Sequence, residues 1–166
     1  FIFTWGLVYI LFLNSELATS NMMYLTAGVY QKNIRLSKAV TILLYCGIFN
    51  LIGAMIIGAA FAYSSAFNAM DVQHFIVGLV KGKALRGNGQ VLLEAVLANI
   101  FVNVAILAFL LIKDDAAKMW IIISAIFMFV FLGEEHVVAN FASFSIVKFS
   151  AVSPSLEFMN WFNLIR

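Results

Sequence analysis

The hydrophobic positions of this chain form two long unbroken runs and two interrupted ones. Residues 39–63 form a 25-residue stretch without a formal charge, and residues 91–112 form a 22-residue stretch interrupted only by Glu94. A helix needs about 20 apolar residues to cross a hydrocarbon core of about 30 Å. The two unbroken runs therefore predict two full membrane-spanning helices.

The other two runs are interrupted by polar residues. Residues 119–132 are 14 nearly all apolar residues, too few to cross a membrane, and the polar residues 133–136 separate them from a second apolar piece at 137–147. Residues 1–13 are also apolar, and the polar residues 14–16 separate them from further small and apolar residues. Both segments predict helices that break.

The two interruptions share a pattern. Glu16 is followed by Asn21 and Glu135 by Asn140, so that each copy has a Glu with an Asn five positions later, and the copies lie 119 residues apart. Transport proteins built from inverted repeats place their sites at such breaks, near the middle of the bilayer. We therefore predict an all-α fold, a polytopic helical membrane protein with inverted repeats and two broken helices.

Composition supports the membrane assignment. The apolar residue types make up 64% of the chain and the charged ones 11%, whereas soluble domains are about half apolar and a quarter charged. A soluble domain is therefore excluded. A net charge of +2 is too weak to indicate nucleic-acid binding, so no nucleic-acid partner is expected. We expect residues 1–166 to form a single membrane domain, multi-pass in the cell membrane and surrounded by the lipid bilayer.

Ionisable side chains at membrane depth are costly, and they normally face a cavity or a partner. His136 is one such candidate, and Asn140 lies four positions after it, on the same helix face. An Asn amide can fix which ring nitrogen of a histidine carries the proton. The alternative is a packing histidine satisfied by its neighbour. The other candidates are Glu16, Glu94, Glu134 and Glu135.

Five stretches of sequence occur in a characteristic order: FTWGL at 3–7, SELATSN at 15–21, NLIGA at 50–54, AVLANIFVNVA at 95–105 and GEEHVVANF at 133–141. In this order and spacing they resemble the formate/nitrite transporter family, pentameric channels for small monovalent anions. The last stretch is similar to the family's E-H-x-x-A-N run on a broken fifth helix. The resemblance implies the aquaporin-like fold of a six-helix protomer. This chain would be its central part, from the break of the second helix to a point before the sixth.

The resemblance also implies roles for individual residues. His136 matches the central pore histidine, Thr19 the hydroxyl that faces it, and Asn140 the residue that buttresses it. Lys83 matches a vestibule lysine, 16 residues before the family asparagine that Asn99 matches. Each of these residues also has a structural alternative. Lys83 is a solvated interfacial charge in that case, Asn99 a contact between helices, and Thr19 a hydroxyl bonded to its own helix.

The same resemblance places Leu7 and Phe129 at two apolar constrictions, although both are also ordinary lipid or helix contacts in a membrane protein. Glu16 and Glu135 are expected to act structurally at the helix breaks. Ala18 departs from the family, since many members carry an aromatic residue there.

These expectations predict a homopentameric channel or transporter, not an enzyme, that passes formate or nitrite through two apolar constrictions around a central histidine. His136 would either protonate the anion or only donate a hydrogen bond, and the proton is a partner in the first case alone. No cofactor or metal is expected. Two alternatives are a helix-packing subunit without transport activity, suggested by Ala54 and Gly58, and a membrane metalloenzyme built on Glu134 to His136. Adjacent helix residues cannot close on one metal ion, which disfavours the enzyme.

Overall fold

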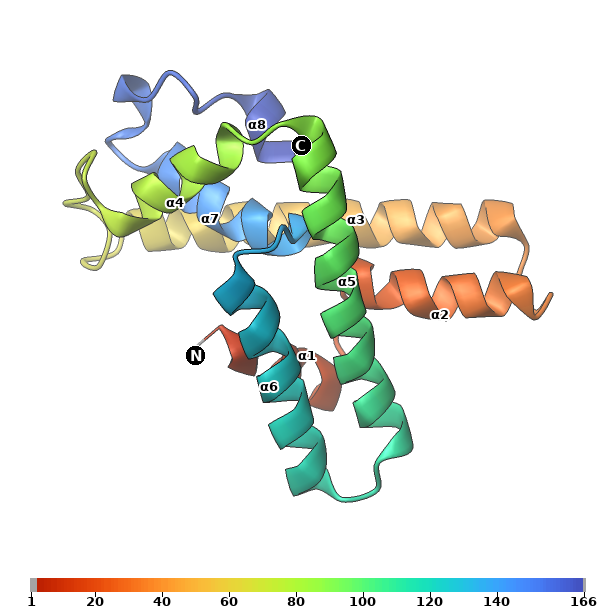
Figure 1. Cartoon of the computed structure of the whole chain (residues 1–166). Helices are drawn as coiled ribbons and strands as arrows, with labels where there is room; N and C mark the ends of the chain where they lie inside the picture. Colours follow the sequence, from red (N-terminus) through yellow and green to blue (C-terminus); the bar gives the residue numbers. More distant parts are fainter. Residues whose placement is uncertain (1–2, 166) are drawn as a thin grey trace. The chain divides into compact units, whose positions relative to one another are not determined.

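The chain is helical throughout the part that the structure describes, and no strand occurs there (Figure 1). The structure is a computed structural model that describes residues 3–165. Its elements, in chain order, are α1 (Thr4–Phe12), α2 (Ala18–Tyr30), α3 (Leu36–Ala62), α4 (Phe75–Ala84), α5 (Asn88–Leu111), α6 (Asp115–Leu132), α7 (Val137–Phe149), the 3-10 helix η1 (Ser153–Ser155) and α8 (Trp161–Ile165). The prediction of an all-α membrane protein is confirmed.

Three helices within the described residues are long and apolar enough to cross a membrane. They are α3 with 27 residues, α5 with 24 and α6 with 18. Helices α3 and α5 confirm the two full spans predicted from the unbroken apolar runs. The two predicted breaks are also confirmed, because α1 and α2 are separate helices, as are α6 and α7.

Helix α6 corrects the prediction that the apolar piece 119–132 is too short to cross. It begins at Asp115, and its 18 residues extend about 27 Å, close to the thickness of the hydrocarbon core. The Asp114 carboxylate caps the helix by accepting a 2.7 Å hydrogen bond from the backbone N–H of Ala117. Lys118 pairs with Asp115 at 3.0 Å in the first turn. The charged residues lie outside the apolar run, so hydropathy does not assign them to the helix. The cap at Asp114 stabilises a helix start before that run.

The chain divides into two compact units. The first contains residues 1–47 and 93–134, and the second contains residues 48–92 and 135–166. In the first unit α1 packs against α6 (Figure 1). The Phe129 ring of α6 contacts the Phe3 ring edge to face, with ring centres 6.1 Å apart. Phe12 of α1 contacts Phe109 of α5 in the same way at 5.3 Å.

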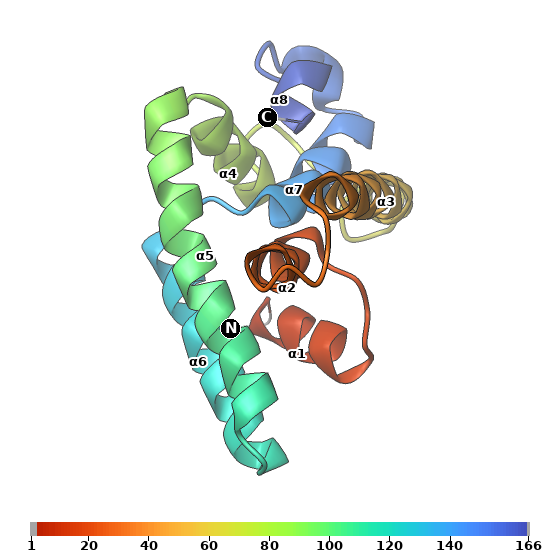
Figure 2. The same cartoon turned by 90° about the vertical axis from the view of Figure 1, so that its right-hand side faces the viewer.

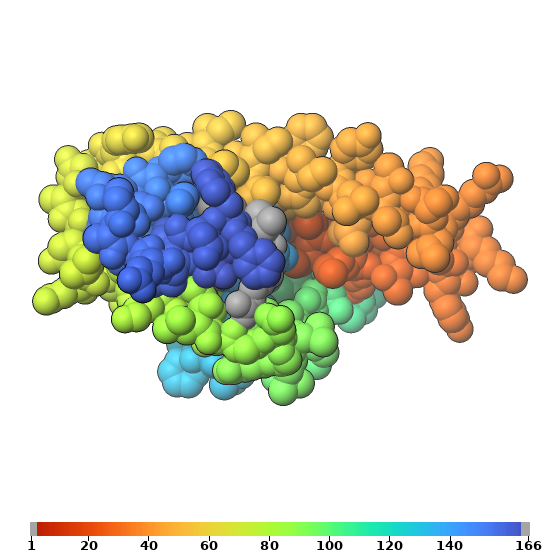
Figure 3. Space-filling model, turned by 90° about the horizontal axis from the view of Figure 1, so that it is seen from above, coloured from red at the N-terminus to blue at the C-terminus, as the bar shows by residue number. Residues whose placement is uncertain are grey.

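Helix α2 and the first part of α3, also in the first unit, lie side by side (Figure 3). The side-chain amide of Asn21, near the start of α2, donates to the Cys46 sulfur of α3 at 3.4 Å. An apolar groove of about 450 Å³ is lined by residues of both helices, from Met22 to Leu43. Helix α2 and the first part of α3 thus form a helical hairpin, which begins directly after the first helix break.

In the second unit α4 and α8 pack against α7 (Figure 2). The buried apolar residues of this unit form one cluster: Met70, Val77, Val80, Phe144, Val147, Val152 and Met159. Helix α4 was not predicted from the sequence. His74 caps it, because its Nδ1 accepts a 3.3 Å hydrogen bond from the backbone N–H of Ile76.

Within the second unit α3 and α7 approach very closely at Gly58. A Cβ atom at this glycine would lie 2.5 Å from the Ser145 Cβ and 3.2 Å from the Ile146 nitrogen. Only the absence of a side chain permits this contact. Gly58 therefore packs within this chain. Its presence is no longer a reason to propose a subunit that packs against a partner protein.

Candidate functional site

The two helix breaks have the same backbone geometry. Asn14 follows the end of α1 by two residues, Gly133 directly follows the end of α6, and both residues adopt the left-handed conformation, with φ of 51° and 73°. This conformation reverses the chain at a helix C-terminus, and glycine adopts it without the penalty that a Cβ atom brings. Asn is the side chain that most often replaces glycine there. The two residues lie 119 positions apart, the spacing of the sequence repeat.

The hydrogen bonds that close the two helices correspond pair by pair. After α1, the Ser15 nitrogen donates to the Ile10 oxygen at 2.9 Å. After α6, the Glu134 nitrogen donates to the Phe129 oxygen at 3.2 Å. Both are the six-residue bonds of a Schellman turn, which satisfy carbonyls that the helix end would otherwise leave without partners. The repeat seen in the sequence is thus a repeat of structure as well.

The helices that follow the breaks also begin alike. The Asn21 side-chain amide donates to the Glu16 carboxylate at 2.6 Å, and the Asn140 amide donates to the Glu135 carboxylate at the same distance. Each bond joins the extended residues of a break to the first turn of the next helix. The Glu and the Asn of each copy are thus joined by a hydrogen bond. Glu16 and Glu135 both lie where the sequence placed them, at the breaks.

The two helix starts differ in their caps. The residue before α7 is His136, whose Nδ1 accepts a 3.2 Å hydrogen bond from the backbone N–H of Ala139. The equivalent residue before α2 is Leu17, which has no side chain able to accept such a bond. Because Nδ1 of His136 accepts, a neutral imidazole carries its proton on Nε2. The sequence assigned the choice of tautomer to Asn140, whereas the cap at Ala139 already determines it.

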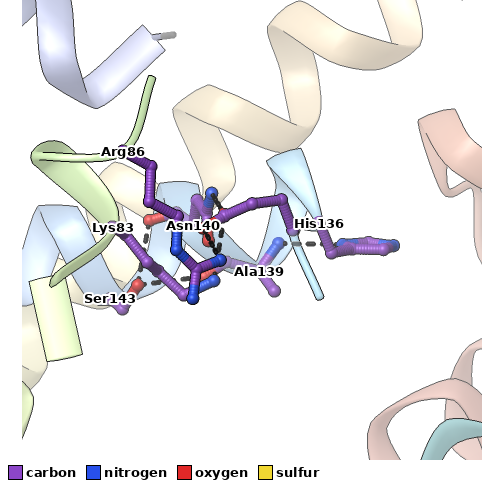
Figure 4. Close-up of polar contacts among 7 residues, drawn as sticks. Lys83, Arg86, His136, Ala139, Asn140 and Ser143 are labelled. Atoms are coloured by element: carbon purple, nitrogen blue, oxygen red, sulfur yellow. Dashed lines mark hydrogen bonds and ion pairs between the residues drawn. The ribbon is translucent and has the colours of Figure 1, made fainter. Parts of the chain in front are cut away.

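The Glu135 carboxylate is the centre of a charged cluster in the second unit (Figure 4). It accepts hydrogen bonds from the Lys83 ammonium at 3.0 Å, from Arg86 Nη1 at 2.7 Å and from the Asn140 amide at 2.6 Å. Its side chain is only 4% exposed. In Figure 4 the His136 ring points away from Lys83 and Arg86. The break before α7 therefore presents two chemically different groups, an ion-paired carboxylate and an imidazole.

Lys83 is therefore not a solvated interfacial charge. Its side chain is 16% exposed and is paired with a carboxylate 52 residues later in the chain. Sequence analysis missed Arg86, the second cation of the cluster. The signal that could have found it is the spacing of Lys83 and Arg86, three residues apart and hence on neighbouring positions of a helical turn. Nothing in the sequence indicates that both residues meet Glu135.

A small cavity adjoins this cluster. Its volume of about 20 Å³ is enough for one water molecule. It is lined by Lys83, Glu135 and Asn140 on its polar side, and by Ala84, Val91, Phe144 and Asn163 elsewhere.

The remaining predicted site residues lie in the first unit. Thr19 is in the first turn of α2 and is 3% exposed. Leu7 of α1 and Phe129 of α6 are both buried, on two helices that pack together. Asn99 of α5 donates to the Ala95 carbonyl of its own helix at 2.8 Å. Of the predicted residues the structure brings together Lys83, Glu135 and Asn140.

Glu134 is another of the ionisable candidates at the second break. One of its oxygens, Oε2, is buried and accepts no hydrogen bond from the described residues. Among residues 3–165 no three His, Cys, Asp or Glu side chains come together as a metal-binding group.

Comparison with known proteins decides the family. Residues 1–166 match the formate/nitrite transporter family over their whole length. The chain belongs to this family. It is therefore a member of a family of transporters, not of enzymes, and a multi-pass membrane protein.

Three relatives illustrate the range of formate/nitrite transporters that this chain is similar to. It is 27% identical to the formate channel BtFdhC of Bacillus thuringiensis, over 99% of this chain and 61% of that protein. It is 30% identical to a probable formate transporter of Methanothermobacter thermautotrophicus, over 99% of this chain and 65% of that protein. It is 27% identical to the formate-nitrite transporter of Plasmodium falciparum, over 80% of this chain and 45% of that protein. The chain thus spans less than two thirds of the length of each.

Proposed function

We propose that this member of the formate/nitrite transporter family passes small monovalent anions, such as formate or nitrite, across the cell membrane. The observation that carries the proposal is the family match over the whole chain. Two relatives, one named a formate channel and one a probable formate transporter, align with nearly all of this chain. The two helix breaks fit the proposal, because transport proteins bind ions where their helices are interrupted.

The helix breaks supply the electrostatics that an anion needs. Moving a bare carboxylate into a medium of dielectric constant about 4 costs tens of kcal/mol. A helix N-terminus offers backbone N–H groups and about half a positive charge. The start of α2 at Ala18 and the start of α7 at Val137 are two such ends, and Thr19 lies in the first turn of α2. We propose Thr19 as a hydroxyl that contacts the anion.

His136 is proposed as the central polar group of the passage. Its Nδ1 accepts the capping bond of α7, so a neutral imidazole has its N–H at Nε2, and we propose this group as the donor to an anion. Two mechanisms follow. The anion takes that proton and crosses as a neutral acid, or it accepts a hydrogen bond and remains charged. Asn140 supports His136 through Glu135, since it ties the first turn of α7 to the residue before the histidine.

Leu7 and Phe129 are proposed as the two apolar constrictions of the passage. Both are buried large hydrophobic residues, as a constriction that excludes water requires. Lys83 is proposed to attract anions to the passage, and Asn99 to line it. The proposed roles of these four residues rest on the family resemblance.

The proposed assembly is a homopentamer within the lipid bilayer. Helices α3 and α5 carry many exposed large apolar side chains, among them Leu44, Ile56, Leu93 and Leu110. Such faces are suited to lipid or to other helices. Chemical cross-linking in native membranes, followed by mass determination of the largest product, tests the pentamer.

A flux measurement tests the proposed function. The protein is reconstituted into liposomes, and uptake of labelled formate and of labelled nitrite is followed with empty liposomes as the reference. We expect saturable uptake of both anions and none of gluconate, which is too large for two apolar constrictions. The His136→Phe variant is the matched control, since it keeps an aromatic ring of similar size. Equal uptake with and without the protein would refute the proposed function.

A further inference from the structure

The segment that joins α2 to α3, at the end of their hairpin, carries three cations and no acid (Figure 1). Lys32, Arg35 and Lys38 are all exposed, and residues 31–38 contain neither Asp nor Glu. In the part of the chain that the structure describes, none of the three cations pairs with a carboxylate. These three side chains are therefore available to a ligand of negative charge.

Two of the three cations lie at a helix start. Helix α3 begins at Leu36, so Arg35 directly precedes it and Lys38 lies in its first turn. The N-terminus of a helix carries about half a positive charge, and acidic side chains are the ones that stabilise it. The first turn of α3 has no acidic residue. Positive charge is thus concentrated at this end of the α2–α3 hairpin, without an acid in residues 31–38 to balance it.

The apolar groove of about 450 Å³ begins beside this charge. Tyr30, the last residue of α2, and Leu36, the first of α3, both line the groove, and they flank the basic segment. Farther along α3 the groove is lined by Ala39, Val40 and Leu43. Together with Leu36 these residues have the spacing of one helix face. The groove therefore has apolar walls and a cationic end.

The residues at the cationic end are typical of the interface between membrane and water. Tyr30 is 88% exposed, and tyrosines are enriched at the level of the lipid headgroups. Lys and Arg side chains near helix ends extend to the same level. Loops rich in Lys and Arg face the cytoplasm, and the cytoplasmic leaflet carries anionic lipids. The cations are thus suited to a headgroup, and the apolar walls to a chain inside the bilayer.

We propose that the α2–α3 groove binds an anionic phospholipid, with an acyl chain against the apolar walls and the phosphate on Lys32, Arg35 and Lys38. A phospholipid combines an apolar chain with an anionic group at one end, which is the arrangement that the groove complements. A second copy of this chain fits less well, because a two-fold contact between two such grooves would bring their basic segments together. The lipid site is independent of the proposed transport function.

Lipid binding to the purified protein in an uncharged detergent tests the proposed site. Dioleoylphosphatidylglycerol is titrated into the protein, and native mass spectrometry gives the amount bound and its Kd. Dioleoylphosphatidylcholine has the same chains and no net charge. We expect it to bind about a hundredfold more weakly, because each of three cations contributes about fivefold to binding an anionic lipid. Glycerol phosphate has the charge without the chains and should not displace phosphatidylglycerol.

A charge variant tests the cationic end. Arg35→Gln/Lys38→Gln should raise the Kd for phosphatidylglycerol about 25-fold and leave that for phosphatidylcholine unchanged. Its unfolding midpoint without lipid should not fall, because both residues are exposed and cations at a helix start are unfavourable. Lys81→Gln/Lys113→Gln is the matched control, since it removes two exposed cations outside residues 31–38 and should change the Kd by no more than about twofold.

A second variant tests the apolar walls and leaves the three cations in place. Thr26→Trp puts a large side chain into the groove and should weaken binding of both lipids about tenfold, because the acyl chain loses its place. Ala27→Trp is the matched control, since Ala27 is an exposed neighbour on α2 that does not line the groove. It should leave both Kd values within about twofold.

Four outcomes would overturn the proposed lipid site. They are equal Kd values for the two lipids, an unchanged Kd in the charge variant, an unchanged Kd in Thr26→Trp, and displacement of phosphatidylglycerol by glycerol phosphate. The last would mean that the basic segment binds phosphate alone. A change of oligomer mass in Thr26→Trp at an unchanged Kd would identify the groove as an interface between copies of this chain, and would overturn the lipid site as well.

Discussion

The side-chain amide of Asn140 donates a 2.6 Å hydrogen bond to the carboxylate of Glu135, across the start of α7. A bond of the same length joins Asn21 to Glu16, 119 residues earlier. Each bond ties a helix start to the extended residues before it, where backbone hydrogen bonds are interrupted. The surroundings differ, because Glu135 is buried and ion-paired, whereas Glu16 is exposed.

This difference predicts unequal costs for removing the two asparagines. Asn140→Leu should lower the free energy of unfolding by about 1–3 kcal/mol, the cost of removing a donor from a buried charged acceptor. Asn21→Leu should cost no more than about 1 kcal/mol, since the Glu16 carboxylate is exposed. Thermal unfolding of both variants in the same detergent checks this. Equal losses would show that burial of the carboxylate does not determine the strength of the motif.

Gly133 is expected to be necessary for the end of α6. Its φ of 73° places a Cβ atom in an unfavourable position, so Gly133→Ala should destabilise the protein by about 1–2 kcal/mol. The matched control is Gly53→Ala in α3, where an added Cβ meets open space and should stabilise the helix by about 0.5–1 kcal/mol. Unfolding midpoints should therefore move in opposite directions. A rise in both would mean that the turn at Gly133 is not under conformational constraint.

Gly58 is expected to tolerate no side chain. In Gly58→Ala the new Cβ would lie 2.5 Å from the Ser145 Cβ, and overpacking of this kind costs about 1–3 kcal/mol, more than the gain in helix propensity. Adding Ser145→Gly removes the closest atom and should recover part of the loss. The measurement is the unfolding midpoint of the single and double variants. An unchanged midpoint for Gly58→Ala would show that α3 and α7 separate without cost.

His136 is expected to control the pH dependence of transport. His136→Asn keeps a side chain that can cap α7 but does not titrate, so formate uptake should persist and lose its steep dependence on pH. His136→Phe removes both the cap and the hydrogen-bond donor and should stop uptake. Uptake is measured between pH 5 and 8, the range in which histidine normally titrates. If His136→Asn keeps the original pH profile, the histidine does not transfer a proton.

The sequence by itself determined the class of protein and the positions of its breaks. Long apolar runs indicate spans because no other backbone structure satisfies its hydrogen bonds inside a bilayer. The repeat of Glu and Asn marked both breaks because the residues that form each motif are only five apart. The turns at Asn14 and Gly133 are also local, and both residues lie within the interruptions that the sequence marked.

Only the tertiary structure decided the partners of the charged groups. Lys83 and Glu135 are 52 residues apart, and the periodicity of hydrophobic positions does not reveal that their side chains form an ion pair. The start of α6 was also missed, because capping by Asp114 outweighs the local hydropathy. The capping bond of His136 was not foreseen because it depends on the orientation of one ring. Local patterns follow from neighbouring residues, whereas ion pairs between distant segments depend on how helices pack.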